Sequence, residues 1–132
     1  MNKVVLVTGG FDPLHSGHIA YFRAAKELGD YLVVGINSDA WLERKKDRAF
    51  MNWNERATIV KNLEMVDYVI EFDDADGSAR DAIQTVKQTW AGHEIVVANG
   101  GDRTAQNIPE TGINGVTYEW GVGGTYKMNS SS

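Results

Sequence analysis

Residues 4–18 read VVLVTGGFDPLHSGH. The β-branched run at 4–8 is typical of a buried strand, and apolar residues recur with helical spacing after Gly17. A strand, a glycine-containing turn and a helix in this order predict the first crossover of a parallel α/β sheet. The carboxyl edge of such a sheet favours a phosphate, because backbone N–H groups and the positive end of the helix dipole both point there.

Two histidines distinguish this turn from other phosphate-binding turns. His15 and His18 are three residues apart, so one face of a helix carries both rings to the same group. Gly17 between them is expected to leave room for a ligand close to the backbone. The turn has neither a P-loop nor a G-x-G-x-x-G motif, so imidazoles would serve the phosphate. Two other roles stay open: a core or capping role for both rings, or a zinc site that His93 completes.

The rest of the chain alternates predicted strands with predicted helices. The predicted strands are apolar runs at 31–36, 67–72, 94–98 and 116–120. The predicted helices are one over 17–28 that ends at Gly29, a short one capped by 37–39 that carries 40–42, one that begins at 51–56, and one over 79–90. The buried face of the third helix is expected to include Ile59, Val60, Leu63 and Met65. We expect the acidic stretch 73–78 to be a solvated turn and helix cap.

The composition favours one globular domain over residues 1–132. Hydrophobic residues make up 42% of the chain and charged residues 23%, which is ordinary for a soluble protein. No apolar run approaches the ~18 residues of a membrane span, and the chain has no cysteine for disulfides, thiol catalysis or metal binding. A net charge of -5 argues against a nucleic-acid surface. We therefore expect a cytoplasmic protein without nucleic-acid or membrane partners.

The segment GGFDPLHSGH resembles the H-x-G-H signature of the cytidylyltransferase-like nucleotidyltransferase superfamily. Its members include cytidylyltransferases for glycerol 3-phosphate, phosphocholine and phosphoethanolamine, and adenylyltransferases for heptose phosphate and pantetheine phosphate. The similarity continues through 24–35 and 54–56 to 66–70. The resemblance implies an α/β fold: a single Rossmann-like, doubly wound parallel sheet of about five strands with helices on both faces.

The resemblance also implies an activity. Members move CMP or AMP from CTP or ATP onto a small phosphorylated acceptor, such as a sugar, polyol or amino-alcohol phosphate, and release pyrophosphate. The alternative is a noncatalytic nucleotide-binding or regulatory module on the same fold. The implied cofactor is Mg2+ that arrives with the triphosphate, with Asp12 or Asp102 as water-mediated contacts. A homodimer is implied as well.

The resemblance assigns roles to individual residues. The catalytic set, which would contact and neutralise the phosphates, is His15, His18, Lys45 and Lys127. The nucleotide-binding set lies in two glycine turns and the tail: Gly9, Gly10, Phe11, Asp12, Gly17, Gly101, Asp102, Arg103, Ser130 and Ser131. The acceptor-binding set is Lys46 and Arg56. No residue is assigned to a resident metal ion.

Several of these assignments compete with a plainer interpretation. By composition, the basic cluster 43–48 is a solvated charged loop, 99–103 is a simple glycine turn, and 121–132 is a flexible end. Arg56 would then be only an ion-pair partner for Glu55 or Asp67. The resemblance instead makes the tail a serine turn that holds the outer phosphates. It also relates 99–103 to the heptose-phosphate adenylyltransferases, which favours ATP over CTP.

Overall fold

The computed structural model describes residues 2–100 and 110–123. Its strands are β1 (Lys3–Gly9), β2 (Tyr31–Ile36), β3 (Tyr68–Glu71), β4 (Glu94–Gly100) and β5 (Val116–Val122). Its helices are α1 (Ser16–Lys26), α2 (Asp39–Lys46), α3 (Trp53–Lys61) and α4 (Arg80–Thr89). Every predicted strand and helix is present, and the differences from the prediction lie at their ends.

The strands form one parallel sheet in the order β3-β2-β1-β4-β5. β1 occupies the centre, where Val4 pairs with Tyr31 of β2 on one side and with Ile95 of β4 on the other. The chain winds outward from β1 to β3 and then crosses to the opposite side of β1 for β4. The direction of winding therefore reverses between β1 and β4. Ligands of open α/β sheets bind beyond the carboxyl ends of the strands at such a point.

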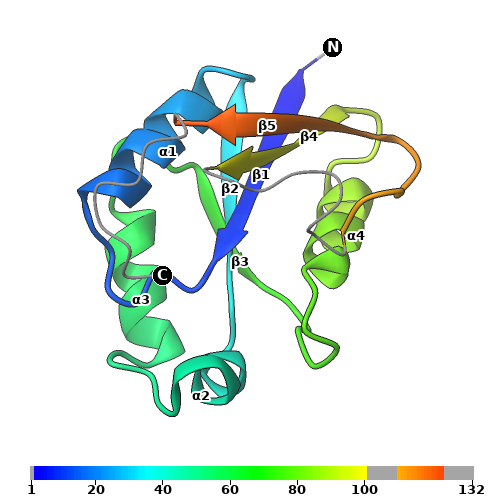
Figure 1. Ribbon diagram of the computed structural model, residues 1–132. Helices are drawn as coiled ribbons and strands as arrows, with labels where there is room; N and C mark the ends of the chain where they lie inside the picture. The colour runs from blue at the N-terminus through cyan, green and yellow to red at the C-terminus, as the bar shows by residue number, and fades with distance from the viewer. Residues whose placement is uncertain (1, 101–109, 124–132) are drawn as a thin grey trace.

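Helices cover both faces of this sheet (Figure 1). α1 and α3 pack on one face, where Phe22 and Val60 are buried, and α4 packs on the other face through Ile83 and Val86. β1 supplies both apolar layers, because successive side chains of a strand point to opposite faces. The predicted doubly wound α/β sheet with helices on both faces is confirmed. Figure 1 also shows α2 beyond the carboxyl end of β2, on the same side as the turn that follows β1.

The first helix begins and ends earlier than predicted. α1 ends at Lys26, and the predicted end at Gly29 is wrong. Gly29 does not adopt the positive φ of a helix-ending glycine. A Cβ at this position would lie 2.8 Å from Val5 Cγ2 and 2.9 Å from the Lys3 carbonyl oxygen. Position 29 therefore needs glycine because the chain passes close to the start of β1.

One expectation about the helices is wrong and a second is confirmed in part. Ile59 is 38% exposed, because α3 turns Ala57 and Val60 toward the sheet and leaves Ile59 outside this face. The predicted cap of α4 is confirmed in part: its N-cap residue Ala79 makes no side-chain capping bond, but the Ser78 hydroxyl accepts the backbone N–H of Arg80 at 3.3 Å. Among the helices of residues 2–100 and 110–123, none has the length and apolarity that a bilayer crossing requires.

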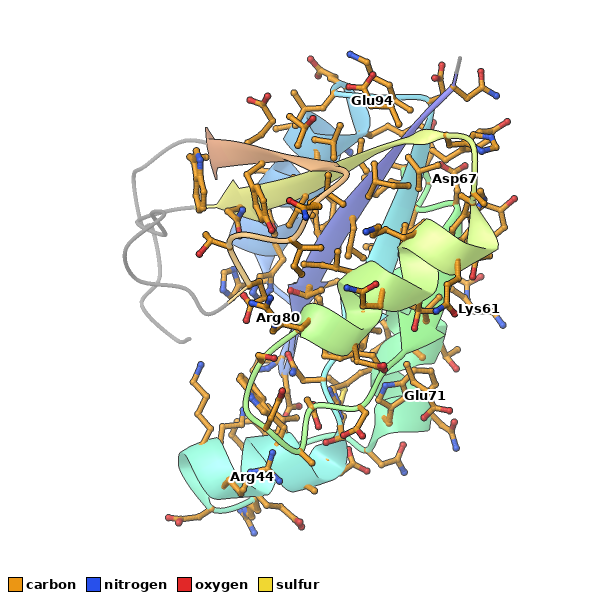
Figure 2. The ribbon with its side chains drawn as sticks, turned by 90° about the vertical axis from the view of Figure 1, so that its right-hand side faces the viewer. Arg44, Lys61, Asp67, Glu71, Arg80 and Glu94 are labelled. Atoms are coloured by element: carbon orange, nitrogen blue, oxygen red, sulfur yellow. The ribbon has the colours of Figure 1, made fainter. Side chains whose placement is uncertain are left out.

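The acidic stretch 73–78 is also less solvated than predicted. Asp74 is 4% exposed, and its carboxylate accepts hydrogen bonds from the Ser38 N–H at 2.8 Å, the Ser38 hydroxyl at 2.7 Å and the Asn37 side chain at 3.0 Å. Burial acts to raise the pKa of Asp74, but hydrogen bonds from Ser38 and Asn37 and the charge of Arg44 hold it below the ordinary value. Asp74 therefore ties this turn to the junction of β2 and α2. Figure 2 shows Arg44 on α2, at the end of the molecule opposite Glu94.

The last strand extends further than predicted. β5 continues to Val122, so the prediction of a flexible end is wrong for Gly121 and Val122. Gly123 then passes close to α1, since a Cβ there would lie 2.9 Å from Tyr21 Cα. The remainder of the predicted tail, residues 124–132, lies outside the described residues.

Candidate active site

The turn from β1 into α1 brings the predicted histidine pair to the carboxyl edge of the sheet. His15 is the N-cap of α1, and its Nδ1 accepts the N–H of Gly17 at 3.1 Å. His18 Nδ1 accepts the backbone N–H of His15 at 3.1 Å, which completes a reciprocal capping box. The two rings stack, with centroids 3.9 Å apart and planes inclined by 24°. Both residues are partly exposed, so the pair is not part of the core.

The capping bonds determine which nitrogen of each ring donates. A neutral imidazole has one donor and one acceptor nitrogen, so a ring whose Nδ1 accepts carries its proton on Nε2. The capping role that the sequence left open is therefore present, and it makes the two Nε2–H groups the donors toward other molecules. Burial, and secondly the nearby His15, lower the pKa of His18 from 6.5 to about 4. His18 is therefore neutral at pH 7 and offers a hydrogen bond rather than a full charge.

Phe11 contributes to the burial of His18. The two rings meet edge-on with centroids 5.1 Å apart, and Phe11 also contacts Phe22 at 5.0 Å. The Phe11 side chain is 6% exposed and folds back over Gly9, where a Cβ would lie 2.8 Å from its ring. This side chain belongs to the core, so only the backbone of Phe11 remains for the predicted nucleotide contact.

The glycines of the turn make room for the protein itself. A Cβ at Gly17 would lie 2.9 Å from Cε1 and 3.1 Å from Nδ1 of His15. A Cβ at Gly10 would lie 2.8 Å from Leu42 Cδ2. Gly17 was expected to leave room for a ligand close to the backbone, and this explanation is wrong. The space is taken by the His15 ring, which closes over the start of α1.

Asp12 connects the turn to the segment between α2 and α3. Its side chain is fully buried, and its two oxygens accept the N–H groups of Phe50 at 2.6 Å and Met51 at 3.0 Å. Lys46 Nζ lies 3.2 Å from Asp12 Oδ2 and also donates to the Asp12 carbonyl oxygen. Because protein groups engage both carboxylate oxygens, Asp12 does not fit the predicted contact with magnesium.

The basic cluster 43–48 is mostly exposed, as predicted, but its first four residues are helical rather than part of a loop. Residues 43–46 form the last turn of α2, and the chain then turns at Asp47 with a φ of 73°. Lys45 Nζ lies 4.7 Å from the centroid of the Trp41 ring, and Lys46 Nζ lies 4.9 Å from that of Phe50. Each lysine therefore rests on an aromatic ring four residues away. The Asp12 contact brings Lys46 to the histidine turn, and Lys45 lies beside it at the end of α2.

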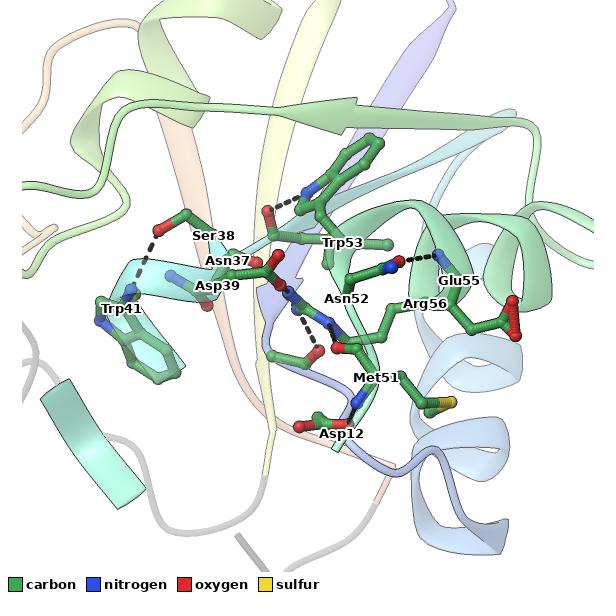
Figure 3. Close-up of polar contacts among 12 residues, drawn as sticks. Asp12, Asn37, Ser38, Asp39, Trp41, Met51, Asn52, Trp53, Glu55 and Arg56 are labelled. Carbon is green, nitrogen blue, oxygen red and sulfur yellow. Dashed lines mark hydrogen bonds and ion pairs between the residues drawn. The ribbon is translucent and has the colours of Figure 1, made fainter. Parts of the chain in front are cut away.

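Arg56 lies buried in a polar network beside the turn (Figure 3). It is 1% exposed, and all of its guanidinium nitrogens donate to protein oxygens. The acceptors are the carbonyl oxygens of Gly10 at 2.9 Å, Asn37 at 2.8 Å and Met51 at 3.0 Å, and Asp39 Oδ1 at 2.6 Å. Its ion-pair partner is Asp39, so the pairing predicted with Glu55 or Asp67 is wrong. These contacts favour a positioning role over the predicted contact with the acceptor.

The carboxyl end of β4 lies next to that of β1, as predicted for the second glycine turn. Tyr21 of α1 reaches this end, where its hydroxyl donates to the Ala98 carbonyl oxygen at 2.5 Å. A Cβ at Gly100 would lie 3.1 Å from the Tyr21 ring. The other predicted site residues of this turn and of the tail lie outside the described residues: Gly101, Asp102, Arg103, Lys127, Ser130 and Ser131.

The zinc alternative for the histidines is wrong. His93 directly precedes β4 and therefore lies at the amino edge of the sheet, whereas His15 and His18 lie at the carboxyl edge. Within residues 2–100 and 110–123, no three His, Cys, Asp or Glu side chains form a group that could hold a metal ion.

Three polar side chains at this edge make contacts that no sequence pattern predicts. Tyr21 bonds a residue 77 positions away, Asp74 bonds one 36 positions away, and Asp39 pairs with one 17 positions away. Only the fold brings such partners together. The Trp41–Lys45 contact is different, because a spacing of four residues on a predicted helix is a signal that the sequence does offer.

Comparisons with known proteins agree with this fold and indicate the family of the chain. Residues 6–116 match a family described as cytidylyltransferase-like. The bifunctional protein HldE of Nitratiruptor sp. is 38% identical over 108 residues, which cover 80% of this chain and 22% of that protein. HldE of Geobacter metallireducens is 41% identical over 108 residues, which cover 80% of this chain and 20% of that protein. The chain thus spans about a fifth of the length of these curated relatives.

A solved structure shares the architecture. The lipopolysaccharide core biosynthesis protein from Thermoplasma volcanium superposes with a TM-score of 0.69 at 27% sequence identity. The superposition covers 91% of this chain and 96% of that chain. The sheet and helices described above therefore recur in a protein of similar extent.

Proposed function

This chain belongs to the cytidylyltransferase-like family, and from that premise we propose that it is a nucleotidyltransferase. It transfers AMP or CMP from ATP or CTP onto a small phosphorylated acceptor and releases pyrophosphate. The observation that supports this most is the histidine pair, whose Nδ1 atoms accept capping bonds so that both Nε2–H groups are donors. These donors lie at the carboxyl edge of the sheet, beside the reversal between β1 and β4, where open α/β sheets bind their ligands.

The proposed reaction needs no general base. An oxygen of the acceptor phosphate attacks the α-phosphorus of the triphosphate. The bond between the α-phosphorus and the oxygen that bridges to the β-phosphate breaks, and pyrophosphate leaves with the electron pair. A phosphomonoester has its second pKa near ~6, so the acceptor is mainly a dianion at neutral pH. Catalysis then consists of alignment and of stabilising the charge that develops in the transition state.

The proposed roles follow from the chemistry of the side chains. His15 and His18 donate their Nε2–H groups to the α-phosphate and to the bridging oxygen. Because His18 is neutral at pH 7, its hydrogen bond strengthens as negative charge grows on these oxygens, which lowers the barrier. Lys45 and Lys46 at the end of α2 neutralise phosphate charge, and the proposal extends this role to Lys127. Magnesium is proposed to arrive bound to the triphosphate and to supply further charge neutralisation.

We propose ATP as the donor and a sugar phosphate as the acceptor. In sequence, the turn at 99–103 resembles that of the heptose-phosphate adenylyltransferases. The similar proteins include HldE and a lipopolysaccharide core biosynthesis protein, and a lipopolysaccharide core is built from sugars. A homodimer is proposed from the family resemblance alone, and light scattering at several protein concentrations tests it.

A pyrophosphate-release screen tests the function. ATP and CTP are each combined with sugar, polyol and amino-alcohol phosphates, and we expect release only when a triphosphate and a matching acceptor are both present. The matched control is the double variant His15→Asn/His18→Asn, which keeps acceptors near the Nδ1 positions but lacks the Nε2 donors. Binding of ATP without release for any acceptor would support the noncatalytic nucleotide-binding module instead. Release at an unchanged rate in the double variant would contradict the role of the histidines.

A further inference from the structure

A buried polar network joins the histidine turn to the segment between α2 and α3 (Figure 3). At its centre Arg56 is 1% exposed, and a charge is tolerated at such depth only when it is paired and hydrogen-bonded. Its donors hold Gly10 beyond β1, Asn37 beyond β2 and Met51 before α3. Asp39 at the start of α2 balances the charge at 2.6 Å. One guanidinium thus connects the ends of two adjacent strands to the starts of two helices.

Asp12 makes a second connection between the same two segments. It accepts the Met51 N–H at 3.0 Å, while Arg56 Nε donates to the Met51 carbonyl oxygen at 3.0 Å. Both backbone polar groups of Met51 are therefore engaged, the N–H by Asp12 of the turn and the carbonyl oxygen by Arg56 of α3. Gly10 and Asp12, the two turn residues in this network, flank Phe11, whose ring contacts His18.

We infer that Arg56 is a positioning residue of the transfer reaction, an inference that rests on the proposed function. By holding Gly10 and Met51 at fixed separation, Arg56 keeps the histidine donors and the lysines of α2 directed at the same phosphates. In-line transfer depends on such alignment. Loss of the network therefore lowers turnover more than it lowers affinity for the triphosphate. The guanidinium does not touch the acceptor, because its nitrogens already donate to protein oxygens.

Arg56→Lys is the variant that isolates this role. Lysine keeps the positive charge opposite Asp39, but a single ammonium group lacks the planar fork that reaches Gly10, Asn37 and Met51 together. We expect kcat for pyrophosphate release to fall by about tenfold to a hundredfold, with the KM for the triphosphate changed by less than about threefold.

The matched control is Lys26→Met, which removes the ion pair between Lys26 and Asp67. Asp67 lies toward the same end of the molecule as Glu94 (Figure 2) and accepts the N–H of Leu32 at the amino edge of the sheet, whereas His15 and His18 lie at the carboxyl edge. We expect this variant to keep the kcat of the unmodified chain. A rise in the acceptor KM at unchanged kcat in Arg56→Lys would show that Arg56 binds the acceptor, and would overturn the inference. Unchanged kcat and KM would overturn it as well.

A spectroscopic measurement separates this inference from the proposed function. Long-range 1H–15N correlation spectra of histidine side chains report which ring nitrogen is protonated. In Arg56→Lys we expect shifted ring signals for His15 and His18 and unchanged signals for His93. This readout needs no turnover, so it decides the positioning role even if no acceptor supports pyrophosphate release, in which case the proposed function alone fails.

Asp39→Asn provides the test if Arg56→Lys does not fold. The Asp39 side chain is 42% exposed. Its replacement therefore weakens the same network but leaves the buried Arg56 in place. We expect smaller changes of the same kind, in kcat and in the ring signals of His15 and His18. Unchanged kcat together with unchanged ring signals in a folded Asp39→Asn would contradict the inference.

Discussion

At the scale of single residues, each histidine of the pair uses its two nitrogens for different purposes. Nδ1 of His18 accepts the His15 N–H and supports the start of α1, while Nε2 is the donor proposed to act on the phosphates. In the proposed reaction the same imidazole has a structural and a catalytic role, and substitution can separate the two.

His18→Asn removes the donor and keeps the acceptor. The amide oxygen of asparagine occupies a position near Nδ1, so we expect a folded variant whose pyrophosphate release is lowered about a hundredfold. His18→Gln extends its amide toward the Nε2 position, so it should keep more activity and lose part of the capping contribution. Initial rates and thermal unfolding of the two variants measure both effects. An unchanged rate in His18→Asn would remove His18 from the mechanism.

At the scale of elements, two glycines serve different contacts: Gly17 in the first turn of α1 and Gly29 beyond its end. Gly17→Ala would direct a Cβ at the His15 ring, so we expect displaced histidine signals and pyrophosphate release lowered about tenfold or more. Gly29→Ala would direct a Cβ at Val5 and the Lys3 carbonyl, so we expect a lower melting temperature with kcat unchanged. If Gly29→Ala lowered kcat as much as Gly17→Ala, a local effect on His15 would be ruled out.

The junction of β2 and α2 depends on Asp74. Asp74→Ala leaves the Ser38 and Asn37 donors without their buried acceptor, and each such group costs about 1–3 kcal/mol. We therefore expect a loss of unfolding free energy of about that size or more, measured by urea denaturation. Asp76→Ala is the control, since Asp76 lies in the same turn but is exposed. Equal losses in the two variants would contradict the structural role of Asp74.

At the scale of the whole molecule, stability should fall on mild acidification. The pKa of His18 is lowered from 6.5 to about 4, so between these values the unfolded chain binds a proton that the folded protein excludes. The free energy of unfolding therefore decreases as the pH falls through this window. The stability that the lowered pKa of Asp74 contributes is lost only at lower pH, because its ordinary value is 3.8.

Urea denaturation between about pH 7 and pH 4.5 measures this dependence. His18→Asn should flatten it, because the group that titrates is gone. His93→Asn, which makes the same change at the opposite edge of the sheet, is the comparison variant. A slope that stays the same in His18→Asn would show that another group is responsible.

Much of the fold was predictable because its signals are local. Runs of β-branched residues indicate the strands, and glycine turns and caps such as Ser38 mark where helices begin. The alternation of strands with helices then predicts a parallel sheet. The proximity of His15 and His18 was predictable in the same way, because the two residues are only three positions apart at the start of a predicted helix. The carboxyl edge as the site is a consequence of that topology.

The partners of the buried polar groups were not predictable from these patterns. Arg56 meets Gly10 across 46 positions and Asp74 meets Ser38 across 36, and no periodicity relates residues so far apart. The same holds for Gly17 and Phe11, whose residue types suggest contact with a ligand until the rings around them are known. Local propensity directs the order and type of the elements, whereas burial and hydrogen-bond pairing arise only when the packed elements exclude water from particular side chains.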